Sequence, residues 1–418
     1  MTAQYDIIII GGGPAGTSTA LHLAQLAPHL ASRTLLLEKA HYPRPKLCAG
    51  GLTVDAEVIL KRLGLDLEEV PCVRADSVHL QFAGKGLRMG NAHDLPGMGN
   101  AHDLPGMGNA HNLPGMGNAH NLPGMGSTMH PAMRLIRRDE FDHWLAQKAR
   151  QRGVQVMDGV RVQGLTLLED KVLVHSQAGD FEAKAVVAAD GSNGIVRQTI
   201  LPDQHPFTAR LLEVLAEANP ASPHPPSSAF FDFAPVPDGI AGYTWDFPAQ
   251  VHGHLMRNWG IMDNNLLSDL PRPALRLRLE QEMQRNGYSL AGLELQGHPI
   301  RCFHPGTRLS RPRLLLAGDA AGSDPLFGEG ISLALGYGYL AALELTGAFE
   351  TGDFNFRHYK RRILLSSLGQ TLLFRYYTTQ VLYSLHWRWF QQLVWQVLQH
   401  LVLAAGWLLV INWARRLR

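Results

Sequence analysis

A glycine-rich turn directly after an apolar run constrains this chain most. Ile7–Ile10 is wholly apolar, and Gly11–Gly16 then reads Gly-Gly-Gly-Pro-Ala-Gly. Tyr5 to Ile10 is predicted to be a buried strand, Ala15 to Gln25 a helix and Thr34 to Glu38 a second buried strand, forming a βαβ unit. G-x-G-x-x-G is uninformative alone, but between a strand and a helix it indicates a turn that binds a dinucleotide pyrophosphate. The sequence therefore predicts the start of a doubly wound parallel sheet.

The residues of this unit have separate roles. Gly11 allows the tight turn, Gly13 leaves room for the pyrophosphate and Gly16 allows the helix to pack closely. Free N–H groups and a positive dipole at the helix N-terminus attract the phosphates. Glu38 ends the second strand, twenty-two residues after Gly16, where a carboxylate accepts from ribose hydroxyls and disfavours a 2′-phosphate. A glycine turn that binds no ligand is the alternative.

Later segments bear on which dinucleotide is bound, because FAD and NAD share adenosine and pyrophosphate. Asp319 follows a strand predicted over Leu314 to Ala317, and its carboxylate suits a ribityl hydroxyl. Asp324–Ile331 opens a long helix, predicted from Gly328 to Phe349, whose N–H groups would face the electron-rich end of a reduced isoalloxazine. Asp190 also ends a predicted strand and is a further candidate for the cofactor site. A plain Asp cap is the alternative for each segment.

The order of these segments resembles a known group. The glycine turn, Ala-Asp-Gly-Ser-Asn at 189–193 and the strings Gly-Asp-Ala-Ala-Gly and Asp-Pro-Leu-Phe-Gly-Glu-Gly-Ile within 318–331 resemble the FAD-binding group of aromatic hydroxylases and geranylgeranyl reductases. Within it the chain is more similar to the geranylgeranyl reductases, on Pro-Arg-Pro-Lys-Leu-Cys-Ala-Gly-Gly at 43–51 and Arg-Asp-Glu-Phe-Asp at 138–142. The resemblance spans roughly residues 5 to 350. It implies a Rossmann-like FAD-binding domain.

The resemblance also implies site residues. FAD contacts are expected from Ala15, Glu38, Ala49, Gly51, Arg138, Val162, Asp319, Gly330 and Ile331. Cys48 is expected beside the flavin ring, with Tyr243 and Trp245 as its catalytic companions. A small buried thiol without a catalytic role is the alternative for Cys48.

A Y-x-W-x-F-P element supports the reductase resemblance. Tyr243–Pro248 reads Tyr-Thr-Trp-Asp-Phe-Pro, similar to an element that lines an apolar cavity above the flavin in the reductases. Flavin halogenases carry W-x-W-x-I-P, a string absent here. The negative ring faces of Tyr243 and Trp245 suit a developing carbocation, and ordinary core packing is the alternative. The proline expected just before the tyrosine lies further upstream, at Pro237, so the cavity entrance is expected to differ.

The resemblance implies stepwise hydrogenation of C=C bonds in the prenyl chain of a lipid, quinone or pigment precursor. A hydride comes from reduced flavin and a proton reaches the other carbon, in a site that excludes water. The sequence does not identify the proton donor. Because it holds no second glycine fingerprint, transiently docked NAD(P)H or a small redox protein is the expected electron donor. A flavin monooxygenase and a non-redox flavoprotein of the carotenoid-cyclase type are the alternatives.

At 418 residues the chain is long enough for two domains. The expected FAD-binding domain is discontinuous, over 1–75, 130–198 and 300–350; an α+β substrate domain covers 76–129 and 199–299, and a helical segment covers 351–418. The net charge of +2 argues against nucleic acid. Three irregularly spaced cysteines fit neither a disulfide framework nor a zinc cluster. With no signal peptide recognised, a cytoplasmic protein is expected.

Between Gly90 and Gly126 the nine-residue unit Gly-Met-Gly-Asn-Ala-His-Asp-Leu-Pro is iterated. Its copies place histidines at 93, 102, 111 and 120, which raises a metal-binding hypothesis. The favoured alternative is an expanded, mobile surface loop, because the copies hold too little apolar content for a core. No metal site is therefore expected, and deletion of the repeat should be tolerated.

The C-terminus is apolar. Between Arg388 and Arg415, 26 residues contain no Asp, Glu, Lys or Arg, a length that suffices to cross a bilayer. Glutamines dilute the first half, and the terminal arginines oppose translocation. A helix lying in the membrane interface is preferred, with an aromatic and cationic anchor of Trp387, Trp389, Trp395, Trp407, Trp413, Arg375, Arg388 and the terminal arginines. Peripheral membrane association is thus expected, and packing on a partner subunit is the alternative.

Overall fold

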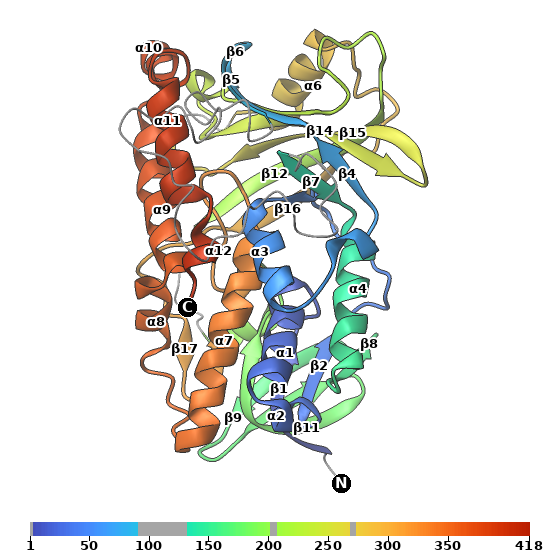
Figure 1. Ribbon diagram of the computed structural model, residues 1–418, viewed down its shortest axis with the longest axis vertical. Coiled ribbons are helices and arrows are strands. Elements are labelled where there is room, and N and C mark those ends of the chain that lie inside the picture. Colours follow the sequence, from blue (N-terminus) through green and yellow to red (C-terminus); the bar gives the residue numbers. More distant parts are fainter. Residues whose placement is uncertain (1–2, 91–131, 201–206, 268–272) are drawn as a thin grey trace, which may run out of the picture.

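The protein was analysed as a computed structural model, which describes residues 3–90, 132–200, 207–267 and 273–418 (Figure 1). Nearly all of the nine-residue repeat, with its four histidines, lies outside the described residues. The metal hypothesis and the expected tolerance of a deletion there stay predictions. Among the described residues no group of three or more His, Cys, Asp or Glu side chains is arranged to hold a metal ion.

The predicted βαβ unit is confirmed and belongs to an eight-stranded sheet. The strands are β1 (Ala3–Ile10), β2 (Thr34–Glu38), β8 (Gln155–Asp158), β9 (Val162–Leu167), β10 (Val172–Ser176), β11 (Gly179–Ala188), β17 (Ser310–Arg311) and β18 (Leu314–Leu316). The main path runs β17-β18-β11-β1-β2-β8 and is parallel from β18 to β8. Helices α1 (Pro14–Leu26), α7 (Ile331–Thr351) and α4 (Arg138–Gln151) lie side by side over this sheet (Figure 1). The centre of the sheet, formed by β2, β18 and the later residues of β1 and β11, therefore consists of buried, largely apolar runs, as in other parallel sheets covered by helices.

A seven-stranded sheet occupies the other end of the molecule (Figure 1). It has the order β16-β12-β15-β14-β13-β5-β6. Its strands are β5 (Ser77–Phe82), β6 (Lys85–Met89), β12 (Thr208–Glu217), β13 (Ser228–Asp232), β14 (Gly242–Val251), β15 (His254–Asp263) and β16 (Gln296–Arg301). All pairs are antiparallel except β13 with β5. The predicted α/β architecture with a second, α+β part is confirmed, whereas the domain boundaries stay predictions.

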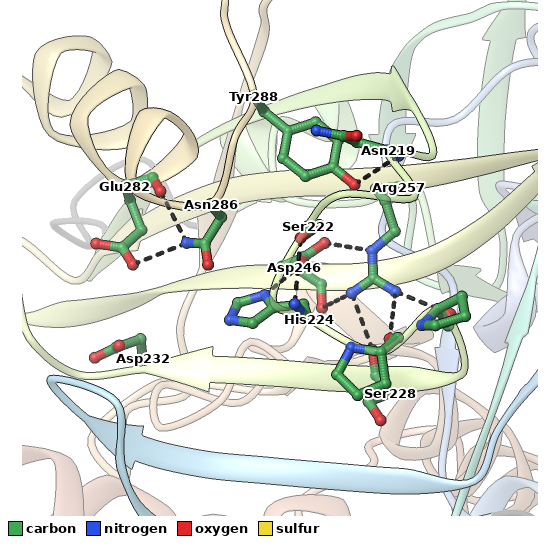
Figure 2. A network of polar contacts seen from close by, with 12 residues as sticks. Asn219, Ser222, His224, Ser228, Asp232, Asp246, Arg257, Glu282, Asn286 and Tyr288 are labelled. Carbon is green, nitrogen blue, oxygen red and sulfur yellow. Dashed lines mark hydrogen bonds and ion pairs between the residues drawn. The ribbon is translucent and has the colours of Figure 1, made fainter.

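One face of this second sheet is closed by α6 (Leu275–Arg285). Val214, Trp259 and Ile261 form a small core there with apolar residues of α6. A buried polar network ties the loop before β13 to the same face. Asp246 accepts from Arg257 and His224, and the Asn219 N–H donates to the Tyr288 hydroxyl (Figure 2). The opposite face carries the aromatic residues of β14 and turns toward the first sheet. The two faces therefore have different partners.

Short elements join the two sheets. A three-stranded sheet pairs β7 (Met133–Ile136) with both β3 (Gly51–Leu52) and β4 (Cys72–Ala75). The remaining short helices before β16 are α2 (Pro28–Ala31), α3 (Val54–Arg62) and α5 (Ile195–Ile200). The predicted helix over Gly328 to Phe349 starts later, at Ile331 in α7, because Gly328 adopts a left-handed φ of 65° that an α-helix does not tolerate.

The C-terminal segment is helical but broken. It comprises α8 (Tyr359–Leu365), α9 (Ser367–Ser384), α10 (Arg388–Gln392), α11 (Gln399–Ala405) and α12 (Trp413–Arg416). The part from Arg388 to Val397 meets the part from Gln399 to Arg416 at 73°. In the described part of the chain, that bent pair and α7 are long and apolar enough to cross a membrane, and α7 is largely buried inside the protein.

Part of the predicted surface anchor is wrong. Arg375 is fully buried, and its guanidinium charge is compensated by Asp324 at 2.5 Å and Glu329 at 2.7 Å. Trp395 and Trp413 are also buried, at 2% and 0% exposure. The Trp395 ring stacks on Phe233 with 3.9 Å between the ring centroids. On either side of Trp413, the backbone N–H groups of Asn412 and Ala414 donate to the Asp55 carboxylate of α3. Three of the predicted anchor residues therefore fasten the C-terminal segment to the rest of the protein; Trp387, Trp389 and Trp407 are exposed.

Candidate functional site

One cavity of about 1740 Å³ lies between the two sheets. It is lined by all but one of the predicted site residues: Gly11, Gly13, Ala15, Glu38, Cys48, Ala49, Gly51, Arg138, Val162, Asp190, Tyr243, Trp245, Asp319, Gly330 and Ile331. The exception, Gly16, is buried in α1, where an added Cβ would lie 1.9 Å from the Gly11 carbonyl oxygen. Close packing of the helix is the role predicted for Gly16. The structure thus brings the sequence motifs together in one place.

The glycine turn leaves its cavity side bare. Gly11 has a φ of 106°, and a Cβ there would lie 2.2 Å from the Ala189 carbonyl oxygen. Gly13 caps α1 without a side-chain hydrogen bond, and the nearest atoms to an added Cβ are guanidinium nitrogens of Arg44 and Arg138, at 3.7 and 3.8 Å. Open space, a helix N-terminus and two cations meet here. This cradle fits a pyrophosphate.

A buried carboxylate holds both cations in place. Asp142, four residues after Arg138 in α4, accepts two hydrogen bonds of 2.8 Å from the Arg138 guanidinium. It also lies 3.1 Å from Arg44 Nη2, and Arg44 Nε is 3.2 Å from Glu38. Burial disfavours the charged form of Arg138, but the Asp142 carboxylate outweighs this and raises its pKa. Asp142 therefore holds the Arg138 guanidinium cationic beside the glycine turn and keeps Arg44 next to it.

Glu38 lies where a ribose-binding acid is expected. It ends β2, lines the cavity and accepts from the backbone N–H groups of Gly12 at 2.9 Å and Ala40 at 3.1 Å. These bonds orient the carboxylate toward the start of α1. Glu38 and the glycine turn therefore meet as they do in dinucleotide-binding βαβ units.

The second half of the cradle comes from two segments far apart in sequence. Gly318 has a φ of 61°, and its added Cβ would lie 2.6 Å from the Ala15 side chain, so the turn after β18 lies against the start of α1. Asp319 Oδ1 is 3.6 Å from an added Gly330 Cβ. The N-terminus of α7 and the Asp319 carboxylate therefore border the same space, which suits the ribityl and ring ends of a flavin.

The loop before β3 brings Cys48 and Lys46 to the cavity. Cys48 is half-buried, and its Sγ lies 3.4 Å from the backbone nitrogen of Gly50, which donates to it. Lys46 Nζ is 3.2 Å from His298 Nε2 of β16. Burial lowers the pKa of both Lys46 and His298, and the neighbouring Asp319 carboxylate opposes this in each case. Titratable groups thus concentrate at this end of the cavity.

The aromatic element forms the facing wall. Tyr243 donates to the Phe327 carbonyl, and the Trp245 indole donates to Asn258 Oδ1 at 2.7 Å. An added Cβ on Gly260, the residue opposite Trp245 in β15, would lie 2.0 Å from the indole ring. The ring therefore lies across the neighbouring strand and covers it. The upstream proline, Pro237, lies in a short helical turn before β14.

Asp190 lies at the edge of the cavity and is buried. Its Oδ2 accepts from the Val196 N–H at 3.1 Å, so it caps the start of α5. Its Oδ1 is buried without a hydrogen-bond partner in the structure, and burial raises the pKa of Asp190 to about 6. The capping role considered for this residue is therefore present, and one oxygen remains for a ligand.

Four residues that line the cavity were not among the predicted site residues: Arg44, Lys46, Glu213 and His298. Neither was the buried Asp142, which holds Arg44 and Arg138 in place. Arg44 and Lys46 lie inside the string at 43–51, and the Arg138–Asp142 spacing is a helical i, i+4 pair. Arg44, Lys46 and Asp142 could therefore have been identified from the sequence. Glu213 and His298 had no such signal, because the pairing of β12 with β16 brings them to the cavity.

The residues present fit FAD. The glycine turn, Glu38 and the two guanidinium groups suit its adenosine and pyrophosphate, and Asp319 with the α7 N-terminus suits the flavin half. When bound, FAD supplies two-electron redox chemistry at its ring. The protein would contribute position, charge and the exclusion of water.

Comparisons with known proteins agree with this fit. The FAD binding domain family matches residues 4–349. A digeranylgeranylglycerophospholipid reductase from Thermoplasma acidophilum is 26% identical over 378 residues, covering 84% of this chain and 80% of that protein. A menaquinone reductase from Mycolicibacterium smegmatis is 24% identical over 371 residues, covering 83% and 77%.

A solved structure shares the fold. The geranylgeranyl bacteriochlorophyll reductase-like protein from Thermoplasma acidophilum superposes with a TM-score of 0.69 at 20% identity, over 91% of this chain and 88% of that one. The family match, which spans most of the chain, and the cavity geometry lead to one conclusion. The chain belongs to the FAD binding domain family and is an FAD-dependent oxidoreductase of the geranylgeranyl reductase-like group.

Proposed function

We propose that this protein hydrogenates C=C bonds of a prenyl chain in a lipid, quinone or pigment precursor. The observation that carries the proposal is the continuity of the cavity from the cofactor cradle to an apolar wall. That wall is built by Phe231, Tyr243, Trp245 and Phe247 of the second sheet and by Trp395, Val402 and Leu403 of the C-terminal helices. Ligand pockets usually measure roughly 300–1,000 Å³, so this cavity has room for a second ligand beside FAD.

The apolar wall suits an isoprenoid. A prenyl chain offers no hydrogen-bonding groups, and burying it beside aromatic and aliphatic side chains is favourable by about 25 cal/mol per Å². The polar atoms of the wall are occupied, since Tyr243 donates to Phe327 and Trp245 to Asn258. The relatives named above are reductases of prenyl-bearing lipids and of a menaquinone by their names, which supports the same substrate class.

Membrane docking is part of the proposal. Residues 354–418 hold nine Lys and Arg but no Asp or Glu, although the whole chain has a net charge of only +2. Large apolar side chains on these helices are at least 41% exposed: Leu365, Tyr377, Val381, Trp387, Trp389, Val397, Leu401, Leu408 and Leu409. Exposed apolar side chains in a cationic segment suit the surface of an anionic membrane. The same helices wall the cavity, so a chain would enter from the lipid, with the protein held peripherally on the cytoplasmic side.

The function is tested with purified, flavin-loaded protein, reduced with dithionite under anaerobic conditions. Geranylgeranyl diphosphate and a prenylated lipid are added and the products are weighed by mass spectrometry. We expect products heavier by two hydrogens per reduced bond. Reduced flavin without product, followed by oxygen insertion on aeration, would show a monooxygenase; an altered product of unchanged mass would show a cyclase. NAD(P)H or a small redox protein, the predicted donors, are then compared as replacements for dithionite.

Membrane docking is tested separately by flotation with phosphatidylglycerol vesicles. Serine substitution of Trp387 and Trp389 should weaken flotation, since both indoles are more than half exposed. The matched control is Leu277→Ser, which alters an equally exposed apolar residue on α6, outside the C-terminal segment. Equal flotation of both variants would contradict docking through these helices.

A further inference from the structure

A buried carboxyl group in the cavity has no role so far. Glu213 of β12 is 9% exposed and lines the cavity together with Leu211, two residues before it on the same strand face. Val214, the next residue, points to the opposite face and the α6 core. The register places Glu213 opposite Gly260 of β15, which is itself opposite Trp245 of β14. Glu213 and the aromatic wall therefore share one face of the sheet.

Two neutral hydrogen-bond donors hold this carboxyl group between the aromatic wall and the loop that carries Cys48. The backbone N–H of Cys48 donates to Glu213 Oε1 at 3.1 Å, so the loop expected beside the flavin ring touches it. The Asn258 amide donates to Glu213 as well, and its oxygen accepts from Trp245 at 2.7 Å. The chain Trp245–Asn258–Glu213–Cys48 thus links the substrate wall to the cofactor loop.

Glu213 forms no ion pair among the described residues, in contrast to the buried acids Asp246 and Asp324, which pair with Arg257 and Arg375. The charged group that faces it is Lys46, whose attraction favours the carboxylate. Beyond Lys46 lie Asp319 and Arg138, which act on it, and His298, whose Nε2 is 3.2 Å from Lys46 Nζ. Burial raises the pKa of Glu213 to about 7, while the bonds from Asn258 and Cys48 and the charge of Lys46 oppose the rise. The group can therefore carry a proton near neutral pH and lose it there.

We propose that Glu213 is the catalytic acid that delivers the proton in C=C reduction, an inference that rests on the proposed prenyl reductase function. The π bond breaks and two C–H bonds form. With reduced FAD bound, one carbon would receive a hydride, which is a proton with two electrons. The other carbon receives the proton of the Glu213 carboxyl group, whose O–H bond breaks and leaves a carboxylate. Solvent then returns a proton to the carboxylate before the next turnover.

The test compares Glu213→Gln with Glu217→Gln, an exposed glutamate on the same strand. In anaerobic single turnovers, Glu213→Gln should oxidise reduced flavin with substrate about 10²-fold more slowly, the usual contribution of a general acid. The wild-type rate should fall as pH rises through about 7, because the acid loses its proton, and Glu213→Gln should lose that dependence. Substrate affinity and flavin content should stay unchanged in both variants.

A second readout does not depend on turnover. Infrared difference spectra of the flavin-loaded protein, recorded as the pH is raised through about 7, should show a protonated carboxyl band that disappears. Asp55, whose pKa is also raised to about 7, contributes to this band in every variant, so the part that belongs to Glu213 is the difference between the wild type and Glu213→Gln. The band should therefore be weaker in Glu213→Gln and unchanged in Glu217→Gln.

The outcomes separate the two proposals. If the wild type reduces no prenyl compound, the proposed function fails and the acid role fails with it. If the wild type turns over and Glu213→Gln matches it, the prenyl reductase function stands and the acid role is overturned. A slower variant that keeps the wild-type pH profile would show that Glu213 only shapes the cavity, which also overturns the proposal.

Discussion

The two faces of the seven-stranded sheet each bury a carboxyl group, but one face pairs it with cations and the other gives it neutral hydrogen-bond donors. On the α6 face, Asp246 lies 2.7 Å from both Arg257 Nε and His224 Nδ1 (Figure 2). On the cavity face, the hydrogen bonds that Glu213 accepts from the described residues come from the neutral donors of Cys48 and Asn258. A buried charge is retained where a cation compensates it and becomes titratable where none does. The first face is therefore built for stability and the second for chemistry.

On the α6 face, the polar network around Asp246 and Arg257 holds the loop before β13. Arg257 donates to the backbone carbonyls of Pro226 at 3.0 Å and Ser228 at 2.9 Å. The His224 ring stacks on Phe230 with 3.7 Å between the ring centroids. These contacts fasten the segment before β13 to the sheet and leave no group of the network facing the cavity.

Breaking the compensated pair should have the largest effect. Arg257→Met leaves the Asp246 carboxylate buried without its cation, which typically costs about 3–5 kcal/mol of unfolding free energy. Denaturant unfolding of the flavin-loaded protein measures the loss. The double variant with Asp246→Asn removes the orphaned charge and should recover much of the stability. A loss below about 1 kcal/mol in the single variant, the range of exposed pairs, would contradict the contrast between the faces.

The pH dependence of stability should show the opposite behaviour of Glu213. Its pKa is about 7 in the folded protein against an ordinary value of 4.5, so the folded state holds the proton more tightly. The stabilisation is complete below about 4.5 and is lost as pH rises through about 7. At 1.36 kcal/mol per pKa unit the loss is about 3 kcal/mol.

Glu213→Gln should lack this component. Subtracting its unfolding free energy from that of the wild type at each pH cancels the other shifted acids, such as Asp55 and Asp190, which are present in both proteins. A difference that does not change with pH would show that Glu213 ionises normally.

Much of the site was predictable because its residues lie in short sequence motifs next to regular elements. The glycine turn, Glu38 and the segment at 318–331 follow or open regular elements, and the carboxyl ends of parallel strands converge at one edge of a sheet. Tyr243 and Trp245 alternate along one strand, so both reach the same face.

The rest depended on long-range pairing. Glu213 reaches the site only through the register of β12 with its neighbours, in a region where the sequence predicted a second domain but no strand order. Arg375 was predicted to belong to a surface anchor because a cation together with the C-terminal tryptophans suits a membrane interface. Its partner Asp324 lies 51 residues earlier in the chain, and apolar periodicity does not distinguish a core from a membrane surface.

Crowding the cavity face should have an intermediate effect. Gly260→Ala would place a methyl group 2.0 Å from the Trp245 ring, which must move; overpacking of this kind costs about 1–3 kcal/mol. Trp245 should also lose its bond to Asn258, so reduction should slow more than the stability loss explains. Gly164→Ala in β9 is the matched control, since an added Cβ there has open space. Unfolding and single-turnover rates measure both effects, and equal behaviour of the two variants would contradict the tight fit.

Removing one hydroxyl from each face should have the smallest effect and separate stability from function. Tyr243→Phe removes the donor to the Phe327 carbonyl on the cavity face, and Tyr288→Phe removes the acceptor of the Asn219 N–H on the α6 face. Each loses one hydrogen bond, worth about 0.5–1.5 kcal/mol, so the unfolding free energies should fall alike. Only Tyr243→Phe should alter substrate affinity or the single-turnover rate, because Tyr243 lines the cavity and Tyr288 packs with the α6 core. Impaired turnover in Tyr288→Phe at unchanged stability would mean that the two faces are coupled.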